Sequence, residues 1–306
     1  MDRHVVAAVD GSRQSLAAAQ WAAGEALRRG VPLRLVHAWT WDPRPAATVP
    51  MGTSRRPWAE ETLRSAAGGV RAAHHGLDVT ELLVKTDAVV DALVAAAAGA
   101  EVAVLGSRGL GPLAGFVLGS VSQRVVARSP RPVVLVRAGV TRSGEHLPAG
   151  DGIAPEEIPG TPYRDVVLGL DTRRPCDELL AFAFDCARRR PGARLHVVHA
   201  YGAALRDLAD GPADTLPAPA GVLAEQERAL VAAVRPWCGK YPEVPVVETV
   251  AEGRAAAELV RASAGASLVV VGRRDHGTHR PGPHVGRVTH AVLHHVACPV
   301  AVVPHE

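Results

Sequence analysis

The sequence predicts an α/β fold of two tandem doubly wound domains, each a five-stranded parallel sheet with helices on both faces. Two observations lead to this prediction. Short runs rich in Val, Leu and Ala alternate with longer helical patterns, which is typical of parallel strands buried on both faces. The order of these segments also occurs twice within 306 residues, a length that suffices for two domains with separate cores.

In the first half, strands and helices are expected to alternate from the start of the chain. The expected strands cover 4–9, 33–38, 79–84, 102–106 and 133–137, and the expected helices cover 13–29, 58–74, 88–98 and 120–128. Gly30 suits the C-cap of the first helix, and Pro32 cannot continue that helix. Alternation of this kind predicts parallel strands joined by right-handed crossovers.

The second half repeats the pattern segment by segment. Arg3–Asp10 recurs as Arg164–Asp171, and Val36–Trp39 recurs as Val198–Tyr201. The fourth and fifth strands recur in the same order. The expected strands of this half cover 165–170, 194–199, 245–250, 267–272 and 299–303. Because the matches stay in order along the chain, we expect a second copy of the same fold.

The boundary between the copies is expected in a segment with no apolar period. Residues Gly139–Pro162 are rich in Gly, Pro and acidic side chains, which indicates an exposed linker. We therefore expect a first domain over 1–140, a linker over 141–162 and a second domain over 163–306.

Composition indicates a globular protein of the cytoplasm. The chain is 47% hydrophobic and 21% charged, and no apolar run approaches the roughly 18 residues of a membrane span. The first residues lead straight into a strand pattern without a signal-peptide pattern. The four cysteines include no Cys-x-x-Cys pair, which suits a reducing compartment. A net charge of +3 is too small to indicate nucleic-acid binding.

A glycine-rich loop follows the fourth strand of the first half. Its pattern is Gly106-x2-Gly109-x9-Gly119-Ser120, between a buried strand and a helix start. Glycine permits close approach of backbone to an anion, and the free N–H groups of a helix start point toward it. The alternative is a mobile surface loop. Asp10 ends the first strand and faces the same edge, either as a ribose or adenine ligand or as the N-cap of the next helix.

This loop pattern resembles the nucleotide signature of the universal stress protein family. Three further segments carry the resemblance in the family's order: Val5–Ser12, Leu35–Trp39 and Arg131–Val136. The resemblance implies strand order 3-2-1-4-5, with a switch point between the first and fourth strands. Ligands in such sheets bind at the carboxyl ends of the strands beside the switch point.

The resemblance also implies a set of ATP contacts in the first domain. Gly106 would lie under the ribose, and Gly109, Gly119, Ser120 and the Val121 amide would hold phosphates, with Mg²⁺ as a companion ion. AMP and cyclic AMP are the alternative ligands. The family often has Pro where this chain has Ala8. The full set of implied contacts is Ala8, Asp10, Ala38, Leu105, Gly106, Gly109, Gly119, Ser120 and Val121.

The second half departs from the nucleotide pattern. Gly272 remains, but Arg273–Gly277 replaces the first part of the glycine spacing, and Arg287 stands where the first half has Ser120. A carboxylate at Asp275 would repel a polyphosphate. We therefore expect this half to be a degenerate, structural copy, with Arg287 as the one remaining anion partner.

Several further motifs carry weaker signals. Gly109–Ala114 fits a loose dinucleotide fingerprint but follows the wrong strand and lacks the acidic partner. No P-loop and no nucleophile elbow occur. His290 and His294 have a spacing that suits zinc, but a solvated helix face is the favoured interpretation. His37 is interpreted as a polar residue at a strand end. The Pro-rich segment between Trp39 and Trp58 suits either a cover over the nucleotide or a surface excursion packed by its tryptophans.

The predicted function is an adenine-nucleotide-binding stress protein that senses or signals, with no catalytic residue and no protein-held metal. The resemblance leaves slow ATP hydrolysis or self-phosphorylation on Ser120 or Ser122 open. Two competing functions are a slow nucleotide hydrolase of the related superfamily and a nucleotide-free scaffold for a protein partner. We also expect the last strands of the two halves, Val133–Val136 and Val300–Val303, to pair as a pseudo-dimer within one chain. A homodimer of the whole chain is a further possible assembly. We expect neither nucleic acid nor a membrane as a partner.

Overall fold

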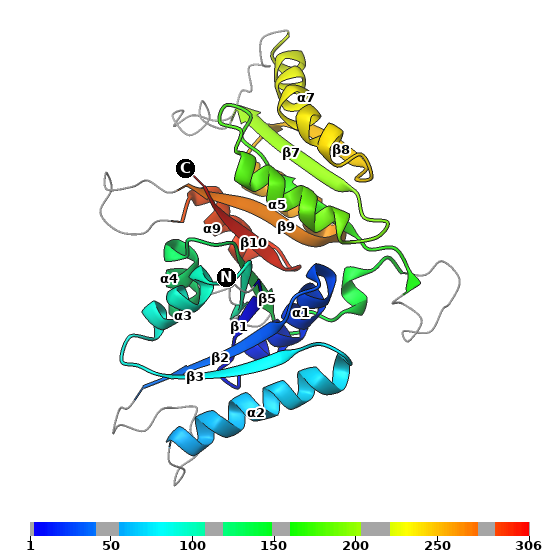
Figure 1. Ribbon diagram of the computed structural model, residues 1–306. Coiled ribbons are helices and arrows are strands. Elements are labelled where there is room, and N and C mark those ends of the chain that lie inside the picture. Colours follow the sequence, from blue (N-terminus) through cyan, green and yellow to red (C-terminus); the bar gives the residue numbers. More distant parts are fainter. Residues whose placement is uncertain are drawn as a thin grey trace. The chain divides into compact units, whose positions relative to one another are not determined.

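A computed structural model describes residues 3–40, 55–107, 119–148, 160–202, 221–274 and 285–305 (Figure 1). These residues form two compact units, one up to Arg142 and the other from Ser143 onward. Each unit is a doubly wound α/β domain, which confirms the predicted fold class.

The first domain alternates strand and helix in the predicted order. Its elements are β1 (Val5–Ala8), α1 (Arg13–Arg29), β2 (Leu33–Trp39), α2 (Arg55–Ala73), β3 (Val79–Lys85), α3 (Val89–Ala98), β4 (Val102–Ser107), α4 (Ser120–Arg128) and β5 (Val133–Arg137). The strand order is β3-β2-β1-β4-β5, with every neighbouring pair parallel. Helices α1 and α2 cover one face of this sheet, and α3 and α4 cover the other. Figure 1 shows α2 running along β2 and β3.

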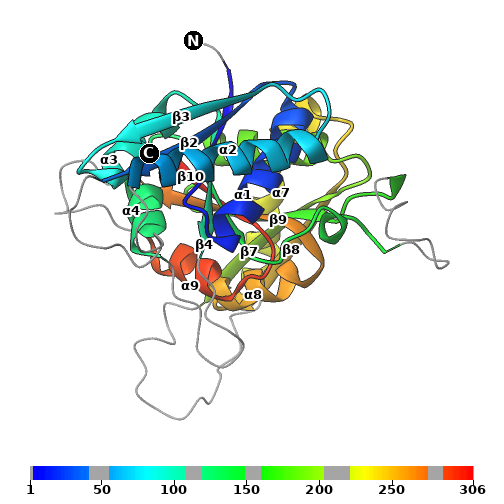
Figure 2. The same ribbon diagram turned by 90° about the horizontal axis from the view of Figure 1, so that it is seen from below.

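The second domain repeats this arrangement. Its elements are η1 (Ser143–Glu145), β6 (Asp165–Gly169), α5 (Asp177–Arg188), β7 (Leu195–Gly202), α7 (Val222–Lys240), β8 (Val246–Gly253), α8 (Ala255–Ala262), η3 (Ser263–Gly265), β9 (Ala266–Arg274), α9 (Arg287–His295) and β10 (Val300–His305). The order β8-β7-β6-β9-β10 is again parallel throughout. Helices α8 and α9 lie side by side on one face (Figure 2).

The local signals that set the first helix act as the sequence predicts. Gly30 is the C-cap in the left-handed conformation, with φ 65°, and its N–H bonds the carbonyls of Ala26 and Leu27. The inner strands are buried on both faces, and their residues Val5, Ala7 and Val104 are fully inaccessible to solvent, whereas the outer strands β3 and β8 are partly exposed. The core of each domain therefore lies on both sides of its sheet, and the polar groups gather at the strand ends.

One part of the expected linker is more buried than predicted. Glu145 and His146 are only 4% and 2% exposed. His146 Nδ1 donates to the Thr161 carbonyl at 2.8 Å, and the Leu147 amide donates to the Pro162 carbonyl at 2.8 Å. These bonds hold residues 143–148 against the start of the second domain, so this segment is part of that unit and not exposed along its whole length.

The sequence also leads to expectations about a membrane and about pairing between strands or chains. Within the described ranges, no helix has the combination of length and apolar character that crossing a bilayer requires. The pairing of the two last strands, and any homodimer, stay predictions.

Candidate functional site

The carboxyl ends of β1 and β4 form the edge where the sequence places the site. The register pairs Val5 with Val102 and Ala7 with Val104, so Ala8 and Leu105 come level with each other at this edge. Both residues line a small apolar hollow of about 10 Å³ beside α3. The helices that follow the two strands, α1 and α4, pack on opposite faces of the sheet. This edge is therefore a topological switch point, the usual ligand position in such folds.

Asp10 is exposed directly after β1, and its carboxylate is oriented by the start of α1. Its Oδ1 accepts a hydrogen bond from the Ser12 amide at 3.0 Å. Ser12 is the N-cap, because its hydroxyl accepts from the Ser15 amide at 3.2 Å. The alternative in which Asp10 itself caps the helix is therefore wrong. The Asp10 carboxylate is held in a local turn at the edge of the sheet.

Gly106 has a packing role that the sequence does not reveal. A Cβ atom at this position would lie 2.6 Å from the Gln14 carbonyl carbon and 2.7 Å from the Ser15 amide nitrogen. Glycine is required here because the first turn of α1 crosses β4 at very close range. The carbonyl of Gly106 also accepts a hydrogen bond from the Ser122 hydroxyl at 2.9 Å, which ties the start of α4 to the end of β4.

The start of α4 has the properties of an anion site. Its N-cap is Gly119, no side chain caps the helix, and its first turn contains no acidic residue. Ser120 and Val121 are exposed, whereas Ser122 is buried and its hydroxyl is engaged with Gly106. The amides of a first turn have no partner within the helix, and the helix dipole favours negative charge there. Gly109, the other predicted phosphate contact, lies outside the described residues.

The end of β2 supplies the remaining predicted contact. Ala38 is half-buried at the same edge, next to His37, which is 3% exposed. Burial lowers the pKa of His37, although the Val9 carbonyl and the Asp10 charge act in the opposite direction. The ring meets Trp58 edge-on, with centroids 5.7 Å apart. His37 is thus a neutral packing residue at neutral pH, and Trp58 packs against it beside the edge of the sheet.

The equivalent edge of the second domain is arranged differently. Asp171 matches Asp10, but the Arg173 guanidinium binds its carboxylate with N–O distances of 3.0 and 3.2 Å. Burial alone would raise the pKa of Asp171, but the hydrogen bonds and charge of Arg173 hold it below its ordinary value. Arg173 stands where the first domain has Ser12. The second domain therefore lacks the serine N-cap, and the side chain at this position binds the Asp171 carboxylate instead.

Two features of the second copy are retained. The Thr289 hydroxyl donates to the Gly272 carbonyl at 2.8 Å, as Ser122 does to Gly106 in the first copy. Gly286 is the N-cap of α9 and Arg287 its first residue, and Arg287 is exposed. The hydrogen bond that ties the helix start to the preceding strand is therefore kept in both domains, whereas the first residue of the helix is Ser120 in one and Arg287 in the other.

The histidine pair on α9 gives no support to a metal site. The rings of His290 and His294 lie 4.3 Å apart between centroids. No group of three or more His, Cys, Asp or Glu residues suited to a metal ion occurs in the described part of the chain. Two imidazoles alone fall short of the three or four protein ligands typical of zinc.

Together these observations define a class of protein, namely two tandem doubly wound α/β domains with the same strand order. The universal stress protein family matches residues 1–137 and, a second time, residues 162–304. The chain therefore belongs to the universal stress protein family as a tandem member, and the resemblance noted in the sequence is confirmed.

Named relatives share this organisation over their whole length. Universal stress protein Rv2005c of Mycobacterium tuberculosis is 34% identical over 304 residues, which cover 97% of this chain and 96% of the relative. A universal stress protein of Mycolicibacterium smegmatis is 29% identical over 311 residues, covering 98% and 96%. The crystal structure of a universal stress protein from Archaeoglobus fulgidus has a TM-score of 0.71 at 17% identity, with 99% and 98% coverage, and supports the fold alone.

Proposed function

We propose that the first domain binds an adenine nucleotide, with ATP as the expected ligand, and that the protein is a sensor or signalling module in a stress response. The observation that carries the proposal is the start of α4, where exposed Ser120 and Val121 follow an N-cap that no side chain occupies. A phosphate group placed there would accept hydrogen bonds from first-turn amides and from the Ser120 hydroxyl. The expected cytoplasmic location stays a prediction.

The nucleoside would occupy the neighbouring part of the same edge. The Asp10 carboxylate, which the bond from the Ser12 amide orients at this edge, would accept hydrogen bonds from the ribose hydroxyls. Ala38 at the end of β2 offers backbone groups to the adenine edge. Ala8 and Leu105 would add apolar backbone surface at the same level of the sheet.

The two domains differ in the features on which this proposal depends. In the second domain Arg173 occupies the carboxylate that corresponds to Asp10, and Arg287 replaces Ser120. We therefore assign nucleotide binding to the first domain and a structural role to the second.

The arrangement supports binding more than catalysis. In this proposal the Asp10 carboxylate faces the ribose and not the phosphate chain, so it does not serve as a base for hydrolysis. Mg²⁺ would be held mainly by the phosphates of ATP. If self-phosphorylation occurs, the exposed Ser120 is a better acceptor than Ser122, whose buried hydroxyl is engaged with Gly106.

Native mass spectrometry of freshly purified protein, followed by calorimetric titration, tests the proposal. One nucleotide per chain, with ATP, AMP or cyclic AMP distinguished by mass and affinity, would support it. Rapid phosphate release by micromolar protein would instead identify a hydrolase. Absence of any saturable heat with all three nucleotides would overturn the proposal in favour of a nucleotide-free scaffold.

A further inference from the structure

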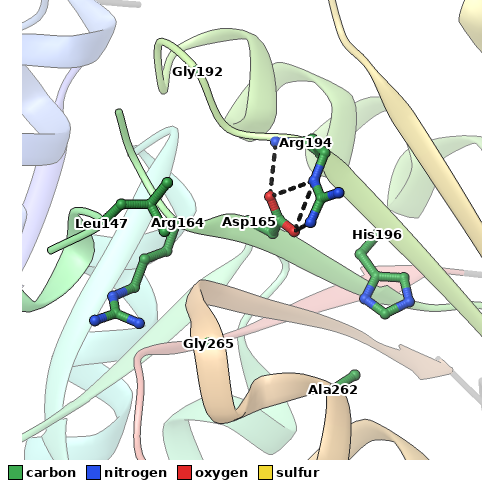
Figure 3. A pocket seen from close by; sticks show the side chains of 8 residues that line it. All are labelled: Leu147, Arg164, Asp165, Gly192, Arg194, His196, Ala262 and Gly265. Atoms are coloured by element: carbon green, nitrogen blue, oxygen red, sulfur yellow. Dashed lines mark hydrogen bonds and ion pairs between the residues drawn. The ribbon is translucent and has the colours of Figure 1, made fainter. Parts of the chain in front are cut away.

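A pocket of about 330 Å³ opens at the amino ends of the strands in the second domain, at the opposite end of the sheet from the switch-point edge. Its size falls at the lower end of the range for small-molecule sites. Figure 3 shows Arg164 on one side, the Asp165–Arg194 pair and His196 on the others, and Ala262 and Gly265 from the α8–η3 connection below. The full lining is Leu147, Arg164, Asp165, Gly192, Arg194, His196, Ala262 and Gly265.

The internal repeat provides a control for the charge at this position. Arg164 corresponds to Arg3 of the first domain, where the guanidinium forms an ion pair with Glu101. In the second domain the residue that corresponds to Glu101 is Ser267, which is 1% exposed and donates its hydroxyl to the Arg164 carbonyl at 2.9 Å. The second domain therefore keeps the arginine, as Arg164, but has Ser267 in place of the carboxylate that pairs with it in the first domain.

The backbone at Arg164 also differs from the equivalent position of the first domain. The register between β6 and β9 shifts at this point, because Asp165 pairs with Ala266 while Val166 pairs with Leu268. Ser267 is the extra residue of this β-bulge, a device that redirects side chains and often occurs beside functional sites.

The Arg164 side chain is held in place by a neutral group. Its Nε donates to the His146 carbonyl at 2.9 Å, in the segment that packs against the start of the domain. Among the residues that the structure describes, no carboxylate lies within ion-pair distance of Arg164. A fixed guanidinium retains terminal N–H groups suited to the two oxygens of a carboxylate or phosphate.

The other polar groups of the pocket add little net charge. Asp165 and Arg194 neutralise each other, with Oδ2 to Nη2 at 2.6 Å and the Arg194 amide on Oδ1 at 3.1 Å. His196 bonds the Thr249 hydroxyl through Nε2 at 2.8 Å, and burial lowers its pKa, so the ring is neutral at pH 7. Arg164 is consequently the one unbalanced charge among the lining side chains.

We propose that this pocket binds a small organic anion whose carboxylate or phosphate group is seated on the guanidinium of Arg164. The apolar part of the ligand would contact Leu147 and Ala262. The open space at Gly265, where an added Cβ would have no neighbour within 4 Å, leaves room for a compact ring. This site is separate from the nucleotide site of the first domain and does not depend on it.

Benzoate, phenyl phosphate and neutral benzamide are suitable probes for the full-length protein, because they share one ring and differ in the group presented to Arg164. Binding is followed by the ring NMR signals of His196, assigned with His196→Gln, up to about 10 mM probe, which covers weak specific affinities. Titrations are repeated in Gly119→Asp, so that phenyl phosphate bound at the α4 helix start is not counted. We expect saturable shifts with at least one anion, which also identifies the preferred head group, and none with benzamide.

Two variants and one matched control test the assignment. Arg164→Gln should weaken binding about tenfold or more, the loss expected when a charged hydrogen bond is removed. Gly265→Leu should fill the pocket and block the probe without disturbing the backbone. Arg3→Gln, at the equivalent position of the first domain, should leave the affinity unchanged. The proposal is overturned if neither anion gives a saturable shift, if benzamide binds equally well, or if both pocket variants bind like the wild type.

Discussion

At the scale of single residues, the repeat shows how the same carboxylate position differs in its hydrogen-bond partners between the two domains. Asp10 and Asp171 end equivalent strands, and both accept a hydrogen bond from the backbone amide two residues later. The side chain two residues later differs, because Ser12 caps its helix whereas Arg173 binds the carboxylate. A single substitution in this turn therefore accounts for much of the asymmetry between the two domains.

The same comparison gives a prediction for the two helix N-caps. Gly119 and Gly286 have φ of −59° and −60°, and both cap their helices without a side chain. Aspartate is a favoured N-cap, so Gly119→Asp and Gly286→Asp should both keep or slightly raise stability. Gly119→Asp should nevertheless abolish ATP binding, since its carboxylate would bond the amides that a phosphate needs.

Calorimetric titration with ATP distinguishes Gly119→Asp from Gly286→Asp. Gly286→Asp should bind ATP like the wild type, and equal losses in both variants would mean that the second domain binds nucleotide as well. Ser120→Ala should weaken ATP binding by about 1.5–3 kcal/mol, corresponding to one hydrogen bond to a charged group.

Gly106→Ala should destabilise the first domain even without ligand. The new methyl group would collide with backbone atoms of Gln14 and Ser15, and overpacking of this kind costs about 1–3 kcal/mol. Gly68→Ala is the control, because it lies exposed inside α2 with no atom near its Cβ position and should raise stability by up to about 1 kcal/mol. Urea unfolding of both variants measures the difference, and equal stabilities would contradict the close crossing of α1 and β4.

At the scale of elements, the C-terminal end of α1 is anchored by a buried charge network. Glu25 is 1% exposed and binds Arg29 at 2.7 Å and Arg28 at 3.1 Å, and Arg29 also reaches Glu101 on the β4 side at 3.4 Å. The helix is therefore fixed to the sheet at both ends, by Gly106 at its start and by this network at its finish.

Glu25→Ala should cost about 3–5 kcal/mol of stability, because it removes the buried carboxylate that Arg28 and Arg29 share. Glu61→Ala breaks an exposed pair with Arg64 on α2 and should cost less than about 1 kcal/mol. Thermal and denaturant unfolding of the two variants provide the comparison. A similar small loss in both would show that the Glu25 network is solvated in solution.

The junction of β2 and α2 predicts a pH dependence. Burial of His37 against Trp58 lowers its pKa below 6.5, so the unfolded chain binds this proton more readily than the folded protein. The stability contribution is complete above the unfolded value and is lost as the pH falls through 6.5 toward the folded value. Between about pH 7.5 and pH 5.5, wild type should lose more stability than His37→Gln. An unchanged pH dependence in this variant would assign the effect to other histidines, such as His74.

Strand and helix periods predict these elements well, because the apolar runs and the caps are local signals. The helix over Arg13–Arg29 and the helix over Ser120–Arg128 agree with the sequence prediction to the residue. β6 ends one residue earlier than predicted, whereas the other strands of the second domain end later. For example, β9 continues the parallel ladder through Arg273 and Arg274, whose polar side chains give no strand signal.

The candidate sites can be predicted only in part, because some of their features depend on local signals and others on contacts between distant segments. The Ser12 cap has a local signature, a serine just before a helical run. The packing need for glycine at Gly106 and the missing partner of Arg164 arise from contacts between segments more than ninety residues apart, for which a single sequence gives no direct signal.

At the scale of the whole molecule, the two domains combine one architecture with two different charge patterns. At the carboxyl edge the first domain has Ser12 and Ser120 at the positions of Arg173 and Arg287, and at the amino edge it pairs Arg3 with Glu101. The second fills its carboxyl edge with the Asp171–Arg173 pair and leaves Arg164 unpaired, within the described residues, at the amino edge. If both proposals hold, each copy has lost one binding site and gained another.

This asymmetry predicts that ATP stabilises one domain and leaves the other nearly unchanged. A ligand that binds only the folded state at about 100 times its Kd adds about 2.7 kcal/mol. For a domain of this size, that corresponds to a rise in melting temperature on the order of 10 °C. Hydrogen exchange of the full-length chain should show added protection in β1, β4 and α4, with none in β6, β9 and α9. Calorimetric scans of wild type and Gly119→Asp in millimolar ATP complete the test, because the variant should show no shift. Equal protection in both domains would contradict a degenerate second copy, and an unchanged melting temperature of the wild type with ATP, AMP and cyclic AMP would leave the scaffold interpretation in its place.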